Sequence, residues 1–350
     1  MADREDVARL AGVSTATVSR VTSGNGYVKK ETRDKVNKAI TMLDYRPNAL
    51  AQNLRRKRNN MVAVMVEDLC NAYTAEGVEV MTREARKYGC YIMLFTVNED
   101  NIDAIVEEIV QSKAMGLVNS TMLKISDSNR RKLLHSKTRT IGIAEKPELD
   151  ILIRYDQAMR EAYKILAKKN KKHPVYMGGL PMDWLLNNYS RVKAFLELNK
   201  EFGMSSTPES IVAGKYPLEK YHIIGYNETN GLFARGVEFD ALFCLTDSMA
   251  MGAIRSLVEH GKRIPEDVAV IGCDNVSLSN FTAPTLTTID TQEEAVYKEY
   301  IRYLLSDDEN IVKCYEINCT RNSLIFYIAY KEISTANNLW LNVGKKTLIR

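Results

Sequence analysis

The sequence lacks any segment that would place the chain in or across a membrane. No run approaches 18 consecutive apolar residues, and the clearest short run, MVAVMV at 61–66, has the length of a buried strand. The N-terminus carries Asp3, Glu5 and Asp6 and no long apolar stretch, so no secretory signal is expected. We therefore expect a cytoplasmic protein with no membrane partner.

The chain is also poor in residues that build metal centres and catalytic sites. Its six cysteines are scattered without a CxxC pair, which indicates reduced thiols rather than disulfides or a zinc site. It has four histidines and no GxSxG, GxxxxGK[ST] or HExxH motif. We therefore expect no enzyme activity, no catalytic residues, no cofactor and no metal.

Charge is unevenly distributed along the 350 residues, a length that favours two or three domains. Residues 1–60 contain 13 Lys and Arg against 6 Asp and Glu, a net charge of +7. The whole chain has a net charge of +4, so residues 61–350 carry −3. A basic head on a mildly acidic body is typical of a polyanion-binding module, although a basic solvated surface gives the same balance.

The stretch DVARLAGVSTATVSRV (6–21) predicts two short helices around a glycine turn. Gly12 suits the turn because it adopts φ > 0 without a Cβ penalty, and Ser14 is a suitable N-cap for the second helix. A third helix is expected from about residue 30. The predicted inward side chains are listed by helix: Val7, Ala8, Leu10 and Ala11; Val18 and Val21; Val36, Ala39, Ile40 and Leu43.

Small and polar side chains are left on the outer face of the second helix. This arrangement predicts a helix-turn-helix whose second helix enters the DNA major groove. Small residues such as Ala16 let that helix approach closely, while Arg20 has the geometry to bind a guanine edge and Thr15 reaches a base or a phosphate. Helix pairs of this kind also occur in cores that bind nothing.

The next segment, YRPNALAQNLRRKR (45–58), places a proline before an apolar helical pattern and ends in four basic residues. With GVSxxTVSR before it and YRPNxxAxxL within it, the chain resembles transcription regulators of the lactose-repressor/galactose-repressor (LacI/GalR) family. That resemblance implies a hinge helix that folds on DNA, with Leu54 wedged into the minor groove and Ala51 beside it. The alternative for Leu54 is an ordinary core position.

The resemblance also implies a set of DNA contacts. The expected base contacts are Thr15, Ala16, Arg20, Ala51, Leu54 and Arg55. The expected phosphate contacts are Ser14, Thr17, Asn25, Thr32, Tyr45 and Asn48. Two departures from the family lie at Asp3 and Arg4, where Thr and Ile are usual; Asp3 can still cap a helix, but Arg4 cannot replace a buried Ile.

From residue 61 onward, short apolar strands alternate with helical patterns, as in VAVIGCD (268–274) after a helix near 248–260. Alternation of this kind predicts parallel sheets covered on both faces, here two doubly wound subdomains in an α/β fold. Ligands of such sheets bind at the carboxyl ends of the strands, so the expected site is the cleft between the halves.

The body resembles the same family, whose cores are similar to periplasmic sugar-binding proteins. The strongest matches are 242–275 and 286–290, whereas 215–236, with glycines at 225, 231 and 236, matches poorly. The resemblance implies a small effector, a sugar or a nucleobase-like molecule, between the lobes. The implied effector contacts are Tyr73, Asp156, Arg191, Asp247 and Asp274.

The chemistry of these residue types suits a sugar or a flat ring. Carboxylates accept from paired hydroxyls, an arginine donates in a bidentate manner, and an aromatic face covers the ring. Each position also has an ordinary structural alternative: Asp274 as a loop cap, Arg191 as a surface ion pair, and Tyr73 as a core residue.

The predicted organisation is a helix-turn-helix head at 1–46, a hinge at 47–60, a two-lobed core at 61–330 and a tail of unknown role at 331–350. One lobe is expected at 61–157 and 286–320, the other at 158–285 and 321–330. We expect a homodimeric repressor that binds a palindromic double-stranded operator under effector control. The alternative is a sugar-binding or sugar-metabolising protein with the same core, which would not need the basic head.

Overall fold

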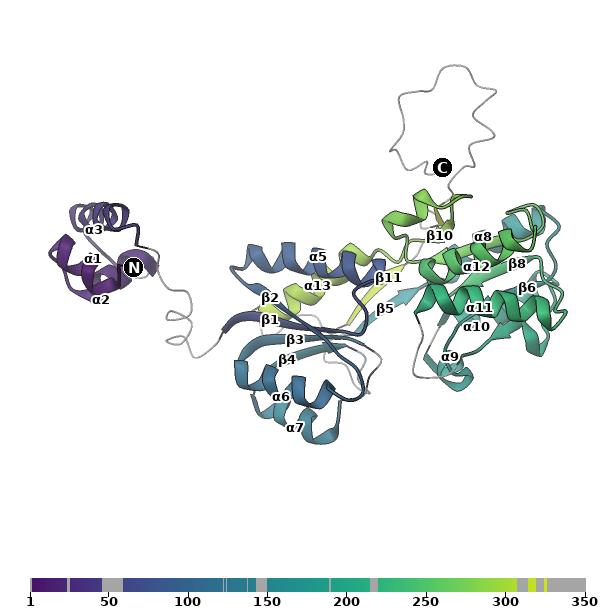
Figure 1. Cartoon of the computed structure of the whole chain (residues 1–350), viewed down its shortest axis with the longest axis horizontal. Helices are drawn as coiled ribbons and strands as arrows, with labels where there is room; N and C mark the ends of the chain where they lie inside the picture. The colour runs from purple at the N-terminus through teal and green to yellow at the C-terminus, as the bar shows by residue number, and fades with distance from the viewer. Residues whose placement is uncertain are drawn as a thin grey trace, which may run out of the picture. The chain divides into compact units, whose positions relative to one another are not determined.

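The computed structural model of the chain divides by its contacts into two compact units, Met1–Asn60 and Met61–Arg350. Figure 1 shows the whole chain. The structure describes residues 2–23, 26–45, 59–121, 123, 125–136, 138–142, 150–188, 190–214, 220–306, 314–318 and 324–325.

The described part of the first unit, the head, contains three short helices. They are α1 (Arg4–Ala11), α2 (Thr15–Ser23) and α3 (Lys30–Met42). One apolar cluster joins them, with Val7, Val18 and Val36 completely buried. These three residues come from three different helices, so the cluster holds the head together as a small folded unit.

One inward position predicted for α1 is wrong. Leu10 is 49% exposed, whereas its neighbours Val7 and Ala8 are buried. The short helix turns Leu10 away from α3, and only the stripe through Val7, Ala8 and Ala11 reaches the apolar cluster.

The second unit begins with a four-stranded sheet in the order β2-β1-β3-β4. Its strands are β1 (Asn59–Val66), β2 (Tyr91–Thr96), β3 (Ala114–Ser120) and β4 (Arg139–Gly142). Its helices are α5 (Ala72–Lys87), α6 (Ile102–Ser112), α7 (Asp127–Ser136) and α13 (Glu293–Leu305). Helices α5 and α13 lie side by side over one face, and α6 and α7 cover the other (Figure 1). We call this assembly the first lobe.

A six-stranded sheet in the order β12-β10-β9-β8-β6-β7 forms the second lobe. Its strands are β6 (Pro174–Met177), β7 (Ile211–Val212), β8 (Ala241–Cys244), β9 (Ala269–Cys273), β10 (Thr287–Ile289) and β12 (Leu324–Ile325). Its helices are α8 (Asp156–Lys168), α9 (Met182–Asn188), α10 (Ser190–Glu201), α11 (Tyr221–Ala234) and α12 (Asp247–Glu259), with short 3₁₀ turns η1 (Pro208–Ser210) and η2 (Ser277–Phe281). The β12–β10 pair is antiparallel, and the other pairs are parallel.

The chain passes between the lobes at three places. Strand β5 (Asp150–Arg154) leads into α8 and pairs in parallel with β11 (Cys314–Asn318), which precedes β12. The third passage joins β10 to α13. The predicted return to the first lobe at 286 is therefore wrong: Thr287 and Ile289 hydrogen-bond in the second sheet, and the chain leaves that lobe only after β10.

Helix α11 forms over Tyr221–Ala234 although its segment matches the family pattern poorly. Its glycines explain how it fits. A Cβ at Gly225 would lie 2.0 Å from the carbonyl oxygen of Met249 on α12, and a Cβ at Gly252 would lie 1.9 Å from the carbonyl oxygen of His222. Two glycines thus let the backbones of α11 and α12 touch, which no larger residue would allow.

Candidate DNA-binding head and effector site

The turn between α1 and α2 has the geometry that the sequence predicts. Gly12 ends α1 in the left-handed conformation with φ +64°, and the Val13 N–H donates to the Ala8 carbonyl at 3.0 Å. The Ser14 hydroxyl accepts from the Thr17 N–H at 3.2 Å and lies 3.0 Å from the Thr17 hydroxyl. Ser14 therefore caps α2 and fixes the start of that helix.

Helix α2 presents small and basic side chains to solvent. Thr15, Ala16 and Arg20 are exposed, while Val18 on the opposite face is completely buried. The stem of Arg20 passes near Gly26, where an added Cβ would lie 3.6 Å from Arg20 Cδ. The outer face is thus free of bulky side chains and carries one long cation, which suits close approach to a DNA groove.

Two departures at the start of α1 have different outcomes. Asp3 caps the helix, accepting from the Glu5 and Asp6 N–H groups at 2.7 and 3.0 Å, and the Asp6 carboxylate accepts from the Asp3 N–H at 3.0 Å. Arg4 is half-buried in the first turn. The reciprocal cap therefore starts α1 without the apolar residue that the family usually has there.

In the second unit, Arg191 on α10 is held in place from two sides. It is 7% exposed, its Nη1 donates to the Leu245 carbonyl at 2.7 Å, and its guanidinium lies 4.8 Å from the centre of the Tyr155 ring. Such contacts rule out the surface ion pair as an explanation for Arg191. They leave a buried, oriented guanidinium at the end of β8, where ligands of parallel sheets bind.

Asp274 follows β9 in a strained backbone conformation with φ +120°. Its N–H donates to the Ile289 carbonyl at 2.9 Å, which ties this loop to β10. Burial raises the pKa of the Asp274 carboxyl well above its ordinary 3.8; the Asp247 charge raises it further and Arg191 opposes the shift. Strain of this kind at a strand end is typical of ligand-binding sites.

Tyr73 lies in the first turn of α5, which Asn71 caps by accepting from the Tyr73 N–H at 3.1 Å. Its ring centre lies 6.1 Å from that of Tyr297 on α13. The pKa of the Tyr73 hydroxyl is raised mainly by burial and then by the charges of Tyr297, Glu293 and Asp274. Tyr73 of the first lobe is therefore within electrostatic range of Asp274 of the second.

A cavity of about 650 Å³ opens between α5, the loop after β9 and the start of α13. Its size matches the range of small-molecule sites. Its lining residues are Glu76, Glu79, Val80, Arg83, Asp274, Asn275, Ser277, Asp290, Gln292, Glu293, Glu294, Ala295 and Lys298. Both lobes contribute to it, so a ligand there would contact both.

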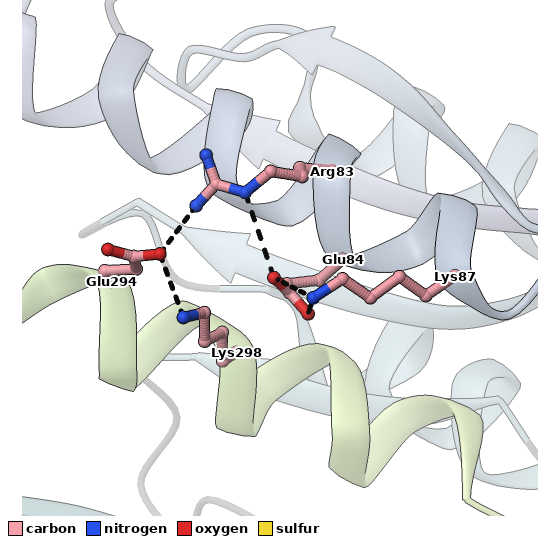
Figure 2. A network of polar contacts seen from close by, with 5 residues as sticks. All are labelled: Arg83, Glu84, Lys87, Glu294 and Lys298. Carbon is pink, nitrogen blue, oxygen red and sulfur yellow. Dashed lines mark hydrogen bonds and ion pairs between the residues drawn. The ribbon is translucent and has the colours of Figure 1, made fainter.

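A network of charged side chains joins α5 to α13 at the edge of this cavity (Figure 2). Arg83 Nη2 and Lys298 Nζ lie 2.8 and 2.9 Å from the same oxygen of Glu294. Lys87 Nζ lies 2.7 Å from Glu84, whose carboxylate is also 3.9 Å from Arg83 Nε. Arg83 and Lys298 are thus both engaged by Glu294.

Two negative findings concern the described residues. No helix among them combines the length and the apolar character needed to cross a bilayer. Within the same part of the chain, no three His, Cys, Asp or Glu side chains are grouped so that they could hold a metal ion.

Two family models match the chain. Residues 5–48 match bacterial regulatory proteins of the lacI family, and residues 166–313 match a periplasmic binding protein-like domain. Catabolite control protein A of Priestia megaterium is 30% identical over 291 residues, covering 81% of this chain and 86% of that protein. The chain belongs to the lacI family of bacterial regulatory proteins.

Other relatives agree with this membership. The transcriptional repressor PurR of Haemophilus influenzae (strain PittEE) is 29% identical over 339 residues, which cover 93% of this chain and 98% of PurR. A lac repressor dimer bound to operator and the anti-inducer ONPF has the same fold, with a TM-score of 0.74 at 21% identity over 91% of this chain and 96% of that one. The transcriptional regulator CelR in complex with cellobiose has a TM-score of 0.63 at 23% identity. The match covers 91% of this chain and 97% of CelR.

The predicted fold class and family are thereby confirmed, and this lacI-family chain is a DNA-binding regulator of transcription. The relatives named above are regulators rather than enzymes, which agrees with the expectation that this chain has no enzyme activity. The individual DNA contacts stay predictions. Five of them lie outside the described residues: Asn25, Asn48, Ala51, Leu54 and Arg55.

Four predicted phosphate anchors lie within the described head and differ in exposure, and Ser14 is the exposed one. Thr17 and Thr32 are half-buried, whereas Tyr45 is 9% exposed and belongs to the apolar cluster of the head. The Tyr45 N–H also donates to the Ile40 carbonyl at 3.0 Å, which closes the C-terminal end of α3. Tyr45 is therefore first a structural residue, and a phosphate contact through its hydroxyl stays a prediction.

Of the five predicted effector residues, Tyr73 and Arg191 each lie within electrostatic range of Asp274, and the assignment of Asp247 is wrong. Asp247 is completely buried in the first turn of α12. Its carboxylate accepts from the Val276 N–H at 3.0 Å and from the hydroxyls of Ser279 at 2.7 Å and Thr288 at 2.5 Å. All of its acceptor capacity goes to the loop after β9 and to β10, so it positions Asp274 rather than binding an effector.

Asp156 is also not brought to Arg191. Asp156 is exposed on the first turn of α8, four residues before Arg160. Its charge adds to the effect of Glu201 in raising the pKa of the Arg160 guanidinium. The preceding residue, Tyr155, is the one that packs against the Arg191 guanidinium. The residue at the end of β5 that contacts Arg191 is thus the aromatic Tyr155 and not the carboxylate of Asp156, one position further along the chain.

The sequence argument missed two carboxylates of the cavity, Glu76 and Glu293. Glu293 is buried although it begins α13. The spacing in the sequence could have indicated this burial. Glu293 lies three residues before Val296 and four before Tyr297, and residues at these spacings share one face of a helix. Both apolar residues are buried, so Glu293 lies on the face of α13 that is directed to the core.

Proposed function

We propose that this lacI-family regulator is a repressor that binds a two-fold symmetric operator as a homodimer and responds to a small molecule between its lobes. The observation that carries the proposal is the outer face of α2. This face is small and carries Arg20, in a basic head attached to a ligand-binding type of body. Because the proposed target is chromosomal DNA, we place the protein in the cytoplasm.

The proposed operator symmetry follows from the symmetry of a dimer. Two heads related by a two-fold axis would read two half-sites of a pseudo-palindrome, with α2 of each head in the major groove. The lac repressor, which has the same fold, binds its operator as a dimer, and this supports the same arrangement here. In the proposed complex, Leu54 of each hinge enters the minor groove between the half-sites.

The proposed effector response follows from linkage between two states. Tyr73 belongs to the first lobe, whereas Arg191 and Asp274 belong to the second, so a molecule held by all three favours one closure of the lobes. Changed closure alters the spacing of the two hinges and so the affinity for DNA. The relatives' described ligands, ONPF and cellobiose, support a sugar-like effector.

The experiment that tests this function is selection of bound sequences from random duplex DNA by the full-length protein at near-physiological salt. The expected result is a two-fold symmetric motif with a deformable central step. Enrichment of a single unpaired half-site would contradict binding as a symmetric dimer. Salt-sensitive binding without any enriched motif, both alone and with candidate effectors added, would contradict a sequence-specific regulator.

A further inference from the structure

The cavity between the lobes is lined mainly by acidic side chains. Among the described residues, its lining includes six carboxyl groups, from Glu76, Glu79, Asp274, Asp290, Glu293 and Glu294, and two cationic side chains, from Arg83 and Lys298. A neutral sugar would need carboxylates for hydroxyl pairs but has no use for so many acidic groups. The composition therefore raises the question of which group of a ligand pairs with them.

The two cations of the lining do not balance the remaining acids. Arg83 and Lys298 both bind Glu294, at 2.8 and 2.9 Å, and Figure 2 shows both side chains directed to that carboxylate. Glu76 is engaged in another way, since it accepts from the Ser277 N–H and hydroxyl at 2.9 and 2.7 Å. Asp274 in turn lies within range of the Arg191 charge, which opposes the rise of its pKa, so the acid that is left to explain is chiefly Glu293.

Glu293 is a buried acid whose hydrogen bonding is incomplete. The residue is 9% exposed, and its Oε1 is completely buried without a hydrogen-bond partner among the described residues. Gly77 of α5 makes room for it, because a Cβ there would lie 2.9 Å from this oxygen. A buried polar atom left without a partner is costly, and such atoms in native proteins commonly mark a site that something else completes.

The surroundings of Glu293 suit a cation better than a neutral molecule. When ionised, Glu293 raises the pKa of both the Tyr73 and the Tyr297 hydroxyl, after burial, so both tyrosines lie near it. Tyrosine rings near a carboxylate add cation–π attraction for an organic cation that reaches their faces. A divalent metal is disfavoured, since no three metal-binding side chains group together within the described residues.

We propose that the cavity binds a molecule carrying a protonated amine, whose ammonium group pairs with the Glu293 carboxylate beside Asp274. This inference rests on the proposed function, because it gives the chemical class of the effector held between the lobes. The effector would be an amine-bearing metabolite, such as an amino sugar or a polyamine, rather than a neutral sugar.

Binding has a definite proton balance. Burial, and next the charges of Asp274, Glu76 and Asp290, raise the pKa of Glu293 to about 9, so its carboxyl is protonated at neutral pH in the empty site. The amine enters as R–NH₃⁺, Glu293 releases its proton to solvent, and the ion pair forms. No covalent bond changes, and about one proton is released for each amine bound.

The test measures the melting temperature of the full-length protein at pH 7 with matched pairs of probes. Each pair differs chiefly by an amine against a hydroxyl: glucosamine and glucose, and putrescine and 1,4-butanediol. We expect one amine to raise the melting temperature by a few degrees while its hydroxyl partner does not. The Glu293→Gln variant should lose this rise, and Glu197→Gln, which removes an exposed carboxylate of α10 outside the cavity, should keep it.

Proton release, followed with a pH indicator in weakly buffered solution, is measured on the unaltered chain and does not depend on how the variant folds. Release near one proton per bound amine supports the pairing. Equal stabilisation by the hydroxyl partner, an unchanged amine effect in Glu293→Gln, or no response to either amine would overturn it. These results leave operator selection unaffected, so failure here is distinguishable from failure of the proposed function.

Discussion

Glu76 on α5 of the first lobe accepts two hydrogen bonds from Ser277 at the start of η2 in the second lobe. The Ser277 N–H lies 2.9 Å and its hydroxyl 2.7 Å from the same carboxylate oxygen. The two residues are 201 positions apart in the chain, so these hydrogen bonds are contacts between the two lobes. The pair ties the first lobe directly to the loop that carries Asp274.

Removing this link should loosen η2 without unfolding either lobe. Glu76→Ala deletes the one oxygen that accepts both hydrogen bonds, and hydrogen bonds to a charged group contribute about 1–3 kcal/mol. We expect amide hydrogens of residues 274–281 to exchange roughly 5- to 150-fold faster, measured by mass spectrometry on the full chain. Glu79→Ala, which removes an exposed acid one turn along the same helix, is the control. Equal exchange in both variants would show that the lobes close without this pair.

Asp247 should be needed for stability rather than for effector binding. Asp247→Ala leaves the Val276 N–H and the hydroxyls of Ser279 and Thr288 without their acceptor, and the expected cost is about 2–4 kcal/mol. Asp247→Asn keeps one acceptor oxygen and should cost less. Urea unfolding of the full chain measures both. A loss below about 1 kcal/mol in the alanine variant would contradict the positioning role.

The same carboxyl should make stability depend on pH with a definite sign. An aspartate has an ordinary pKa of 3.8, whereas burial raises that of Asp247 to about 6, against the opposing hydrogen bonds from Thr288 and Ser279. Between these values the folded state keeps a proton that the unfolded state has lost. The contribution of Asp247 is therefore greatest below about pH 4 and falls as the pH rises to 6, by on the order of 3 kcal/mol.

The difference in unfolding free energy between the native chain and Asp247→Asn isolates this effect, because the other titrating groups are common to both. It should shift in favour of the variant as the pH rises from 4 to 6 and stay constant above that. A difference that does not vary with pH would mean that the carboxyl titrates alike in both states.

Much of the head followed from local patterns, whereas the cavity did not. Val7, Val18 and Val36 are buried as their helical spacing predicts, since short amphipathic helices expose one face and bury the other. The family resemblance also assigned Arg191 and Asp274 to one effector site, and in the structure the charge of Arg191 acts on Asp274. Such predictions succeed where a residue's environment is set by its own helix or by a recognisable motif.

The failures arose where partners distant in sequence decide a side chain's role. Asp247 bonds residues 32 and 41 positions away, and no local pattern shows whether a strand-end carboxylate faces the cleft or the interior. At Tyr155 and Asp156, one position decides which side chain meets Arg191. Successive side chains of a short strand point to opposite faces of the sheet. An error of one position in the sequence prediction therefore assigns the wrong side chain to the site.

Arg20 should determine specificity at a single base pair. It is exposed on α2, and a bidentate contact to guanine is worth about 1–3 kcal/mol at that position. Arg20→Ala should relax preference there while leaving the other positions unchanged, as measured by binding to an operator and its single-base variants. Arg33→Ala, at an exposed position of α3, is the control. If it lowers the affinity for DNA, it should do so equally for all operator variants. A uniform loss for Arg20→Ala would make it a phosphate contact.

Two glycines of α11 should respond to alanine in opposite ways. At Gly225 the new Cβ would lie 2.0 Å from the Met249 carbonyl oxygen, so α11 and α12 must move apart, at about 1–3 kcal/mol for an overpacked contact. At Gly231 the nearest atom is the end of the Arg235 side chain, at 2.9 Å, which can rotate away. Alanine there should be neutral or stabilise the helix by up to about 1 kcal/mol.

Urea unfolding of the two full-length variants compares them within one helix, where propensity is the same and only the neighbour differs. Destabilisation by Gly225→Ala alone would establish that the backbones of α11 and α12 touch. Similar values for both variants would show instead that the glycines serve no packing role. The close contact matters for function because α12 also carries Asp247, which fixes the loop of Asp274. Separation of the two helices should therefore reach the effector site as well as lower the stability.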